Sequence, residues 1–276
     1  MSQSDELSLR ACGLSDVGRV RGHNEDSFEI DSDNHVYIVA DGMGGHRHGE
    51  VASRIAVEAV RRWMDGDGAS GGGSDDLPPH LASLKAAIES AQTAVQDAVE
   101  EDVSLVGMGT TVVAMILRGT SAGVAHVGDS RAYRYRDSEL ERLTKDHTWV
   151  GEQVGAGLLS EEQAKVHPLR NVVTRALGGR GGVVVEMKEI SLLPGDLYLL
   201  CSDGLTTMLS DEEIEEHLEA ADDIQEACRT LITAANAGGG LDNITVLMVE
   251  VVAGDGSGQR NGSADGSGDG SGDGSG

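Results

Sequence analysis

Residues 36–45 read VYIVADGMGG, and they lead from an apolar run through an aspartate into a glycine turn. The run at 36–40 is rich in Val and Ile, which predicts a buried strand, and Asp41-Gly42 predicts the turn that ends it. A strand carries its last side chain rigidly to one rim of a sheet, and the adjoining glycine lets backbone and solvent come close. Asp41 is therefore a candidate site residue.

Three further aspartates have the same placement. Each follows an apolar strand or a glycine turn and is next to a glycine or a polar side chain: Asp129, Asp203 and Asp242. Carboxylates that converge on one point repel one another unless they are protonated or bridged by cations. An all-oxygen donor set suits Mg²⁺ or Mn²⁺ better than zinc. Asp-Gly also marks ordinary turns, but four such positions beside Asn24-Glu25-Asp26 favour a metal centre.

The order of the predicted elements gives the fold class. Strands are predicted at 36–40, 111–117, 122–127, 183–190, 197–201 and 244–252, with a hairpin over 132–143. Helices are predicted at 51–64 and 81–103, from a capping box at Ser210 to about Ala220, and at 222–237. Runs of strands with grouped helices indicate an α+β fold, in which helices cover antiparallel sheets. A doubly wound sheet would require strict alternation.

The chain divides into one domain with short ends. We expect an N-terminal extension at 1–8, a domain at 9–253 and a disordered tail at 254–276 that repeats Asp-Gly-Ser-Gly. A calcium-binding role of the tail is disfavoured because no repeat ends in a bidentate Glu. Residues 149–177 mix polar and apolar positions and break the strand pattern, so we expect a small flap there.

Composition excludes several classes of function. The formal net charge of −26 disfavours nucleic acids and anionic membranes as partners. Three cysteines without close spacing predict neither disulfides nor a zinc site, and the longest apolar runs are too short to cross a bilayer. We expect a soluble, reduced, cytoplasmic protein. The acidic surface fits a salt-rich cytoplasm and an ordinary acidic cytosolic protein about equally well.

Seven motifs occur in one order along the chain. They are Arg21-Gly-His-Asn-Glu-Asp26, Val39-Ala-Asp-Gly-Met-Gly-Gly45, Gly49-Glu-Val-Ala-Ser53, Gly109-Thr-Thr111, Val127-Gly-Asp-Ser-Arg131, Leu199-Leu-Cys-Ser-Asp-Gly204 and Asp242-Asn-Ile-Thr245. Together they resemble the metal-dependent protein phosphatases (type 2C, the PPM class) in their bacterial or archaeal form. The resemblance spans about 9–252. It implies a central β-sandwich of two antiparallel sheets flanked by pairs of antiparallel helices in four layers, with the metals at one end.

The resemblance also implies roles for the aspartates. Asp41 would bridge two Mn²⁺ or Mg²⁺ ions, and the carbonyl of Gly42 would bind the second ion. Asp203 and Asp242 would complete the first site. Asp129, with Asp203, would hold a third, weaker ion. Whether Asn171 in the flap reaches that ion stays open.

Four other positions match the family's supporting residues. Glu25 and Asp26 would orient metal-bound water, Asn243 is a candidate for the same role, and Arg21 falls where the family places its phosphate clamp. A water or hydroxide that bridges the metals would attack the phosphorus of phosphoserine or phosphothreonine. Some members carry His two residues after the bridging Asp, where this chain has Met43. His46 could protonate the leaving group, metal-bound water could do so, or His46 could be a solvated loop residue.

Other phosphatase chemistries fail on sequence, because no cysteine is followed by Arg six residues later and no aspartyl-phosphate motif occurs. The implied function is therefore that of a hydrolase, a protein-serine/threonine phosphatase that reverses kinase signalling. Its expected partners are phosphorylated proteins, including a Ser/Thr kinase, and the chain is expected to be a monomer. The alternative is a catalytically silent phosphatase-fold module that regulates or scaffolds. The expected aspartates are all present, which disfavours that alternative.

Overall fold

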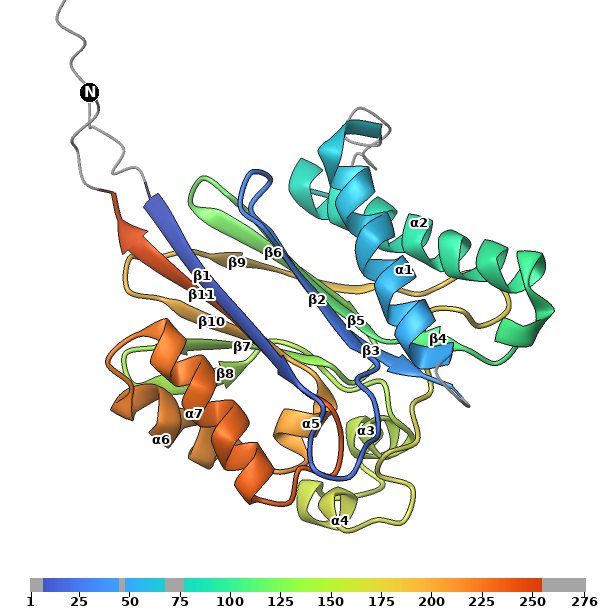
Figure 1. Ribbon diagram of the computed structural model, residues 1–276. Helices are drawn as coiled ribbons and strands as arrows, with labels where there is room; N and C mark the ends of the chain where they lie inside the picture. Colours follow the sequence, from blue (N-terminus) through green and yellow to red (C-terminus); the bar gives the residue numbers. More distant parts are fainter. Residues whose placement is uncertain (1–6, 45–47, 68–76, 255–276) are drawn as a thin grey trace, which may run out of the picture.

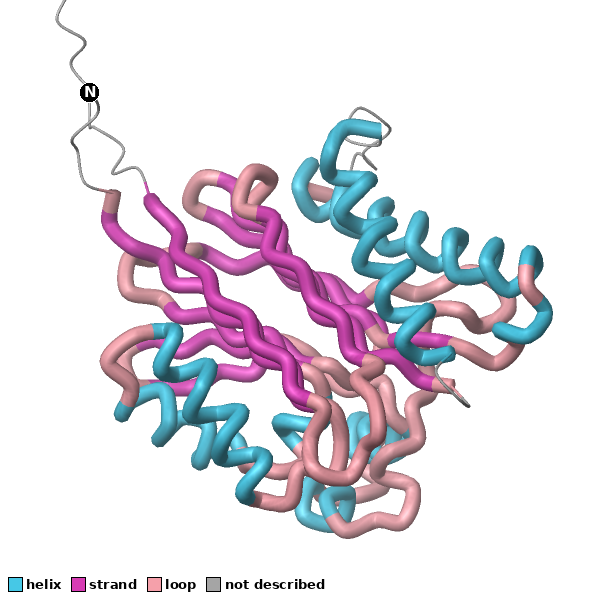
Figure 2. The backbone as a smooth tube through the Cα atoms, in the orientation of Figure 1, coloured by secondary structure: helices cyan, strands magenta, loops and turns pink. Residues whose placement is uncertain are grey.

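The computed structural model describes residues 7–44, 48–67 and 77–254. Within them, two antiparallel sheets pack face to face, and a pair of helices covers the outer face of each (Figure 1). The tube in Figure 2 shows the resulting order of helices, sheet, sheet and helices. The predicted α+β sandwich is confirmed. Among the described residues, no helix combines the length and the hydropathy that a bilayer crossing requires.

The two sheets are built from distant parts of the chain. One has the order β1 (Leu7–Asp16), β11 (Ile244–Ala253), β10 (Leu197–Cys201), β7 (Arg131–Arg136) and β8 (Glu139–Arg142). The other has the order β2 (Asp26–Asp31), β3 (Val36–Met43), β5 (Val112–Arg118), β6 (Ser121–Val127) and β9 (Glu186–Ser191), and β4 (Gly109–Thr110) pairs with β3. The N-terminal and C-terminal strands lie side by side, from Leu7 opposite Ala253 to Asp16 opposite Ile244.

The four long helices lie close to their predicted positions. They are α1 (His48–Arg62), α2 (Pro79–Glu101), α6 (Asp211–Ala220) and α7 (Ile224–Ala237). The capping box at Ser210 is present, because Ser210 Oγ accepts from Glu213 N at 3.2 Å and Glu213 Oε2 accepts from Ser210 N at 2.8 Å. The chain bends out of α1 over Trp63–Asp67, where Gly66 has a φ of +140°.

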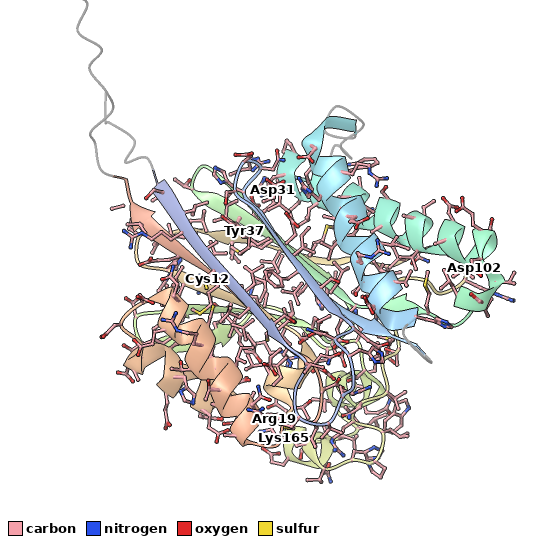
Figure 3. The ribbon with its side chains drawn as sticks, in the orientation of Figure 1. Cys12, Arg19, Asp31, Tyr37, Asp102 and Lys165 are labelled. Atoms are coloured by element: carbon pink, nitrogen blue, oxygen red, sulfur yellow. The ribbon has the colours of Figure 1, made fainter. Side chains whose placement is uncertain are left out.

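The core has three parts, one at each interface between layers. Aliphatic side chains of α1 and α2 pack on β3 and β5, and those of α6 and α7 pack on β10 and β11. Between the sheets lie the large side chains of Tyr37, Tyr198 and Leu247, all buried (Tyr37 is labelled in Figure 3). Val, Leu, Ile, Ala and Met make up most of the core at all three interfaces.

The structure corrects three predictions of local structure. Sequence analysis assigned no strand to β1 or β2, although the alternating residues Leu7, Leu9 and Ala11 pack toward the core between the sheets. The strand predicted at 183–190 begins only at Glu186, because Val183 and Val185 pack under the helices instead of pairing with β6. Val183 and Val185 are core residues outside a strand, and the polar residues of β1 and β2 conceal two strands at the edges of the sheets.

The segment between β8 and β9 leaves the sheets and contains the residues of the predicted flap. It contains α3 (Trp149–Gly155) and α4 (Glu161–Lys165), and the ring of Trp149 stacks on His167 with centroids 4.9 Å apart. An isolated bridge joins Thr148 to Val173 across the base of the segment. A second bridge joins Leu177, further along the chain, to Thr110 of β4. A further short helix, α5 (Asp203–Thr206), follows β10.

Candidate metal centre

The carboxylates singled out in the sequence come together at one rim of the sandwich. Asp41 near the end of β3 lies opposite Asp26, the first residue of β2. Asp129 follows β6 by two residues, Asp203 opens α5 directly after β10, and Asp242 precedes β11 by two residues. Five segments far apart in sequence therefore deliver their acidic side chains to one region, and we refer to these five residues as the rim cluster.

Electrostatics show that the rim cluster is crowded. Burial raises the pKa of Asp41 well above its ordinary value, and the charges of the four other aspartates raise it further. Burial likewise raises the pKa of Asp26 and of Asp129 to about 7 each. For Asp203, burial and the charge of Asp242 raise the pKa to about 6, although a hydrogen bond with Asp41 opposes the shift. The protein alone cannot hold all these groups ionised without a large cost.

This donor set fits hard divalent cations. All donors are oxygens, and Asp26 Oδ1 is buried without a hydrogen-bond partner among the described residues. An orphaned, buried carboxylate oxygen beside three other carboxyl groups whose pKa is raised is what a bound cation, or water held by it, would satisfy. Mn²⁺ and Mg²⁺ prefer such ligands.

The aspartates of the rim cluster are spread wider than the ligands of a single ion. No three of them bring one carboxylate oxygen each within 4.8 Å of one another. Asp242 Oδ2 instead accepts a hydrogen bond from Arg21 Nη2 at 2.6 Å. Repulsion between carboxylates and the attraction of this guanidinium both draw the side chains apart.

The backbone around Asp41 is held from both sides. Asp41 N donates to Thr111 Oγ1 at 3.0 Å, and Thr111 N donates to Asp41 O at 2.9 Å. Gly42 N donates to Glu25 O at 3.1 Å. A Cβ at Gly42 would lie 2.1 Å from Gly49 O and 2.5 Å from Glu25 O, so only glycine fits here. The Asp41-Gly42 motif of the sequence thus reflects close backbone packing as well as a turn.

The predicted supporting residues also join the site. Asp26 Oδ2 accepts hydrogen bonds from Ser202 Oγ at 2.7 Å and from Thr245 Oγ1 at 2.6 Å. Sequence reasoning missed these two hydroxyls, although both stand in motifs that it quoted. Their position beside Asp203 and Asp242 was the available signal.

Asn243 ties the N-terminal loop to the rim. Its Oδ1 accepts from Glu25 N at 2.8 Å, and its Nδ2 donates to Val17 O at 2.9 Å and to His23 O at 3.0 Å. Only 4% of Asn243 is exposed, so this amide fixes the path of residues 17–25. Arg21 lies on that loop, with its side chain half exposed.

One candidate residue lies outside the described residues, and another is exposed. His46 lies outside the described residues, so its predicted acid role stays a prediction. Asn171 is exposed in the segment that follows α4. Arg21, by contrast, is beside the rim cluster: burial lowers its pKa, but the hydrogen bond to Asp242 and the charges of Asp242, Glu25 and Asp41 outweigh this and raise it. Its guanidinium is therefore always charged.

Comparison with known proteins gives one consistent answer. The model of the family "Protein phosphatase 2C" matches residues 19–238. The serine/threonine protein phosphatase PstP of Mycobacterium tuberculosis is 42% identical over 247 residues, which is 89% of this chain but only 46% of that relative's length. The serine/threonine phosphatase stp of Listeria monocytogenes is 41% identical over 249 residues, 85% of this chain and 93% of the relative.

Solved structures agree with the sequence relatives. A crystal structure of the M. tuberculosis phosphatase PstP has a TM-score of 0.80 at 40% identity and covers 88% of this chain and 99% of that chain. The catalytic domain of PstP in complex with two manganese ions has a TM-score of 0.76 at 40% identity, covering 89% and 99%.

Proposed function

The chain belongs to the protein phosphatase 2C family, and from that premise we propose that it is a metal-dependent protein-serine/threonine phosphatase. One observation supports this most strongly: the five aspartates of the rim cluster come from separate segments, and burial together with their like charges raises the pKa of four of them. Such an arrangement is costly for stability and is explained by a bound divalent cation.

We assign the metal-binding role to residues of that rim. Asp41, the carbonyl of Gly42, Asp203 and Asp242 would hold two Mn²⁺ or Mg²⁺ ions, and Asp129 with Asp203 a third, weaker one. The catalytic domain of PstP, one of the similar proteins, has been solved in complex with two manganese ions. When bound, such ions act as Lewis acids that activate water and neutralise phosphoryl charge.

The protein's own residues position the substrate and the ions. Arg21 would bind the phosphoryl oxygens, because its guanidinium is half exposed and has donors beyond the one given to Asp242. Asn243 and Glu25 hold the loop that carries Arg21. Asp26, fixed by Ser202 and Thr245, would orient water at the ions. His46 remains our candidate for the acid that protonates the departing seryl or threonyl oxygen.

Substrates and setting follow from this activity. We propose phosphorylated Ser/Thr proteins as substrates, among them a Ser/Thr kinase, and a monomer that acts in the cytoplasm. The formal charge of −26 disfavours a nucleic acid or an anionic membrane as partner. A silent scaffold is the other reading, and the retention of all four aspartates argues against it.

The direct test is hydrolysis of p-nitrophenyl phosphate and of a phosphothreonine peptide with Mn²⁺, Mg²⁺ or chelator. We expect activity only with a divalent ion. Arg21→Ala should lower kcat/KM by about 10- to 100-fold, since a charge-assisted hydrogen bond contributes about 1.5–3 kcal/mol. Arg19→Ala, a charge removed from an exposed position of the same loop, is the matched control and should change kcat/KM little. Should neither ion activate either substrate, the scaffold reading replaces the enzyme.

A further inference from the structure

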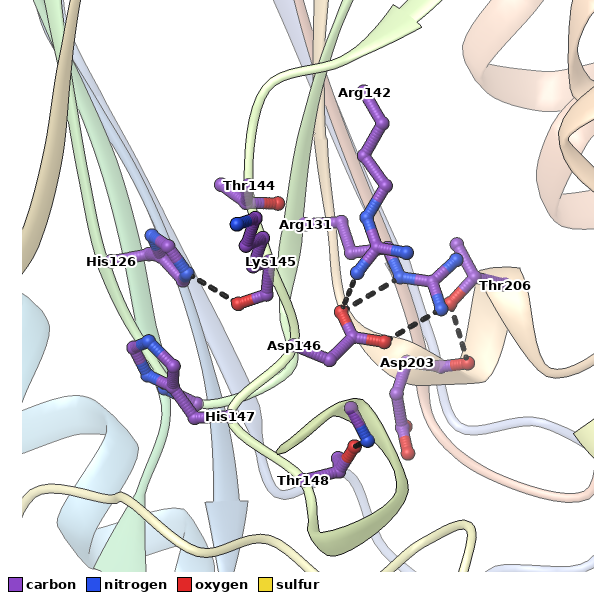
Figure 4. A network of polar contacts seen from close by, with 12 residues as sticks. His126, Arg131, Arg142, Thr144, Lys145, Asp146, His147, Thr148, Asp203 and Thr206 are labelled. Carbon is purple, nitrogen blue, oxygen red and sulfur yellow. Dashed lines mark hydrogen bonds and ion pairs between the residues drawn. The ribbon is translucent and has the colours of Figure 1, made fainter. Parts of the chain in front are cut away.

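His147 is a buried histidine that lies directly behind the turn carrying Asp129. It is 3% exposed and sits in the stretch between β8 and α3 (Figure 4). It exchanges two hydrogen bonds with Gly128: His147 N donates to Gly128 O at 3.0 Å, and Gly128 N donates to His147 Nδ1 at 3.1 Å. A histidine ring thus holds the backbone amide of the residue just before Asp129.

The Gly128 turn is itself tightly constrained. Gly128 has a φ of +110°, and a Cβ there would lie 2.6 Å from the side chain of Thr111. Thr111 Oγ1 lies 2.7 Å from Ser130 Oγ and accepts from Asp41 N at 3.0 Å. The turn therefore contacts the backbone of Asp41 through Thr111 and leads directly into Asp129. A shift of Gly128 would move both carboxylates.

The backbone of His147 also anchors the flap. His147 O accepts from Thr174 N at 2.8 Å, and the next residues form the bridge between Thr148 and Val173. The returning end of the flap and the turn before Asp129 therefore share one residue as their anchor.

A transition-metal site is the obvious alternative for this histidine. His126, His147 and Glu186 each offer a ligand atom, and these atoms lie within 4.8 Å of one another. The two rings stack with centroids 4.6 Å apart. Three such ligands would suit an ion such as Zn²⁺.

The hydrogen bonds argue against that alternative. Because His147 Nδ1 accepts from Gly128 N, the proton of the neutral ring is on Nε2, which donates to Glu186 Oε2 at 3.2 Å. Burial lowers the pKa of His147, which favours this neutral form. An ion on Nε2 would force a proton onto Nδ1, where it would face the Gly128 amide donor. A hydrogen bond joins His147 to Glu186, whereas His126 stacks on His147 and directs its Nε2 to Lys145 O at 2.7 Å.

We propose that His147 is a positioning residue: its Nδ1 fixes the Gly128 amide and thereby the Asp129 carboxylate. This inference rests on the proposed function in one respect: the proposed function assigns Asp129 to the third, weaker ion. His147 itself touches neither the substrate nor the reacting atoms.

Two substitutions test the roles of the two ring nitrogens separately. His147→Asn places an amide oxygen where Nδ1 stands and removes the donor to Glu186. His147→Gln reaches the Nε2 position and removes the acceptor for Gly128. Glu186→Gln, which leaves the Gly128 bond intact and keeps an oxygen acceptor for Nε2, is the control for loss of the charge beside the ring.

The readouts are amide exchange of Gly128 by NMR in the metal-free protein, and Mn²⁺ titration by calorimetry. We expect His147→Gln to speed Gly128 exchange and to weaken the weakest Mn²⁺ site by about 10-fold or more, the range for residues that orient ligands. His147→Asn and Glu186→Gln should stay within about 3-fold of the wild type in both.

Equal effects of His147→Asn and His147→Gln would overturn the proposal, as would unchanged Gly128 exchange in His147→Gln. If His147→Gln does not fold, the comparison of His147→Asn with the wild type decides, because faster Gly128 exchange in His147→Asn contradicts the proposal and equal exchange supports it. The exchange measurement needs no metal or substrate. A wild type without Mn²⁺-dependent hydrolysis would instead count against the proposed function alone.

Discussion

Two sets of buried aspartates in this protein experience opposite environments. Asp196 is 1% exposed, and Arg136 donates to both of its oxygens, at 2.5 and 2.6 Å. Burial raises the pKa of Asp196, but the hydrogen bonds from Arg136, Leu193 N and Tyr198 Oη outweigh it and leave the pKa lowered. In the rim cluster, burial and like charges act together, and the pKa values of Asp26, Asp41, Asp129 and Asp203 are raised.

The contrast extends to neighbours within one region. Asp146 is paired with both Arg131 and Arg142, and its pKa is lowered although burial alone would raise it (Figure 4). Asp203 is drawn in the same view, and its pKa is raised. Burial alone therefore does not separate structural from functional carboxylates. Asp146 and Asp196 pair with arginines, whereas the rim aspartates whose pKa is raised form no salt bridge among the described residues. Asp242 is the one member of the rim cluster that pairs with an arginine, Arg21.

The largest expected effect comes from removing one charge of the rim cluster. Asp203→Asn should lower kcat/KM by at least about 10³-fold, because it removes a proposed ligand of two ions. In the metal-free protein the same change should raise the melting temperature, since it relieves repulsion among buried carboxylates. Activity assays with Mn²⁺ and calorimetry with chelator measure the two effects.

Asp196→Asn is the matched control, because it removes a buried charge that has its own arginine. It should retain most of the activity at a temperature where it is folded. A lower melting temperature of metal-free Asp203→Asn would show that the rim carboxylates stabilise the chain by themselves. That result would contradict the contrast drawn between the rim cluster and Asp196.

Sequence reasoning found the rim cluster because strand ends and Asp-Gly turns are local patterns. Asp41 and Asp203 could be recognised from their immediate neighbours alone. The pair of Arg136 and Asp196 could not, since the partners are 60 residues apart and become neighbours only through the pairing of β7 with β10. The role of His147 was hidden for the same reason: its acceptor function depends on Gly128, which reaches it through the folded sheet.

The second largest effect concerns Asp196, which pairs with Arg136. Asp196→Ala should lower the free energy of unfolding by about 3–5 kcal/mol, because it leaves the Arg136 guanidinium and the Tyr198 hydroxyl without their acceptor. Denaturant unfolding with and without Mn²⁺ measures this loss, which should be the same in both. A loss that disappears on adding Mn²⁺ would mean that Asp196 depends on the metal, as the rim cluster is proposed to do.

Metal addition should stabilise the protein through the rim cluster only. At a free Mn²⁺ concentration about 100 times its Kd, one site contributes about 2.7 kcal/mol to the free energy of unfolding. Calorimetric melting should show this gain in the wild type and in Asp196→Asn, and a much smaller gain in Asp203→Asn. An equal gain in all three proteins would mean that Mn²⁺ binds elsewhere on this acidic surface.

The smallest effect is the pH dependence of the stability that Asp196 contributes. Asp196 has a lowered pKa in the folded protein, so its contribution to stability is fully present above the unfolded value of about 3.9 and is lost as the pH falls through the folded pKa. Each unit by which folding lowers the pKa is equivalent to about 1.4 kcal/mol. The difference in unfolding free energy between the wild type and Asp196→Asn isolates this residue from every other acid, because those groups titrate in both proteins. That difference should be constant from about pH 7 to pH 5 and shrink below about pH 4. A difference that grew toward acid pH would mean that Asp196 takes up its proton more readily when folded, as the rim aspartates do, and the two sets would then be one.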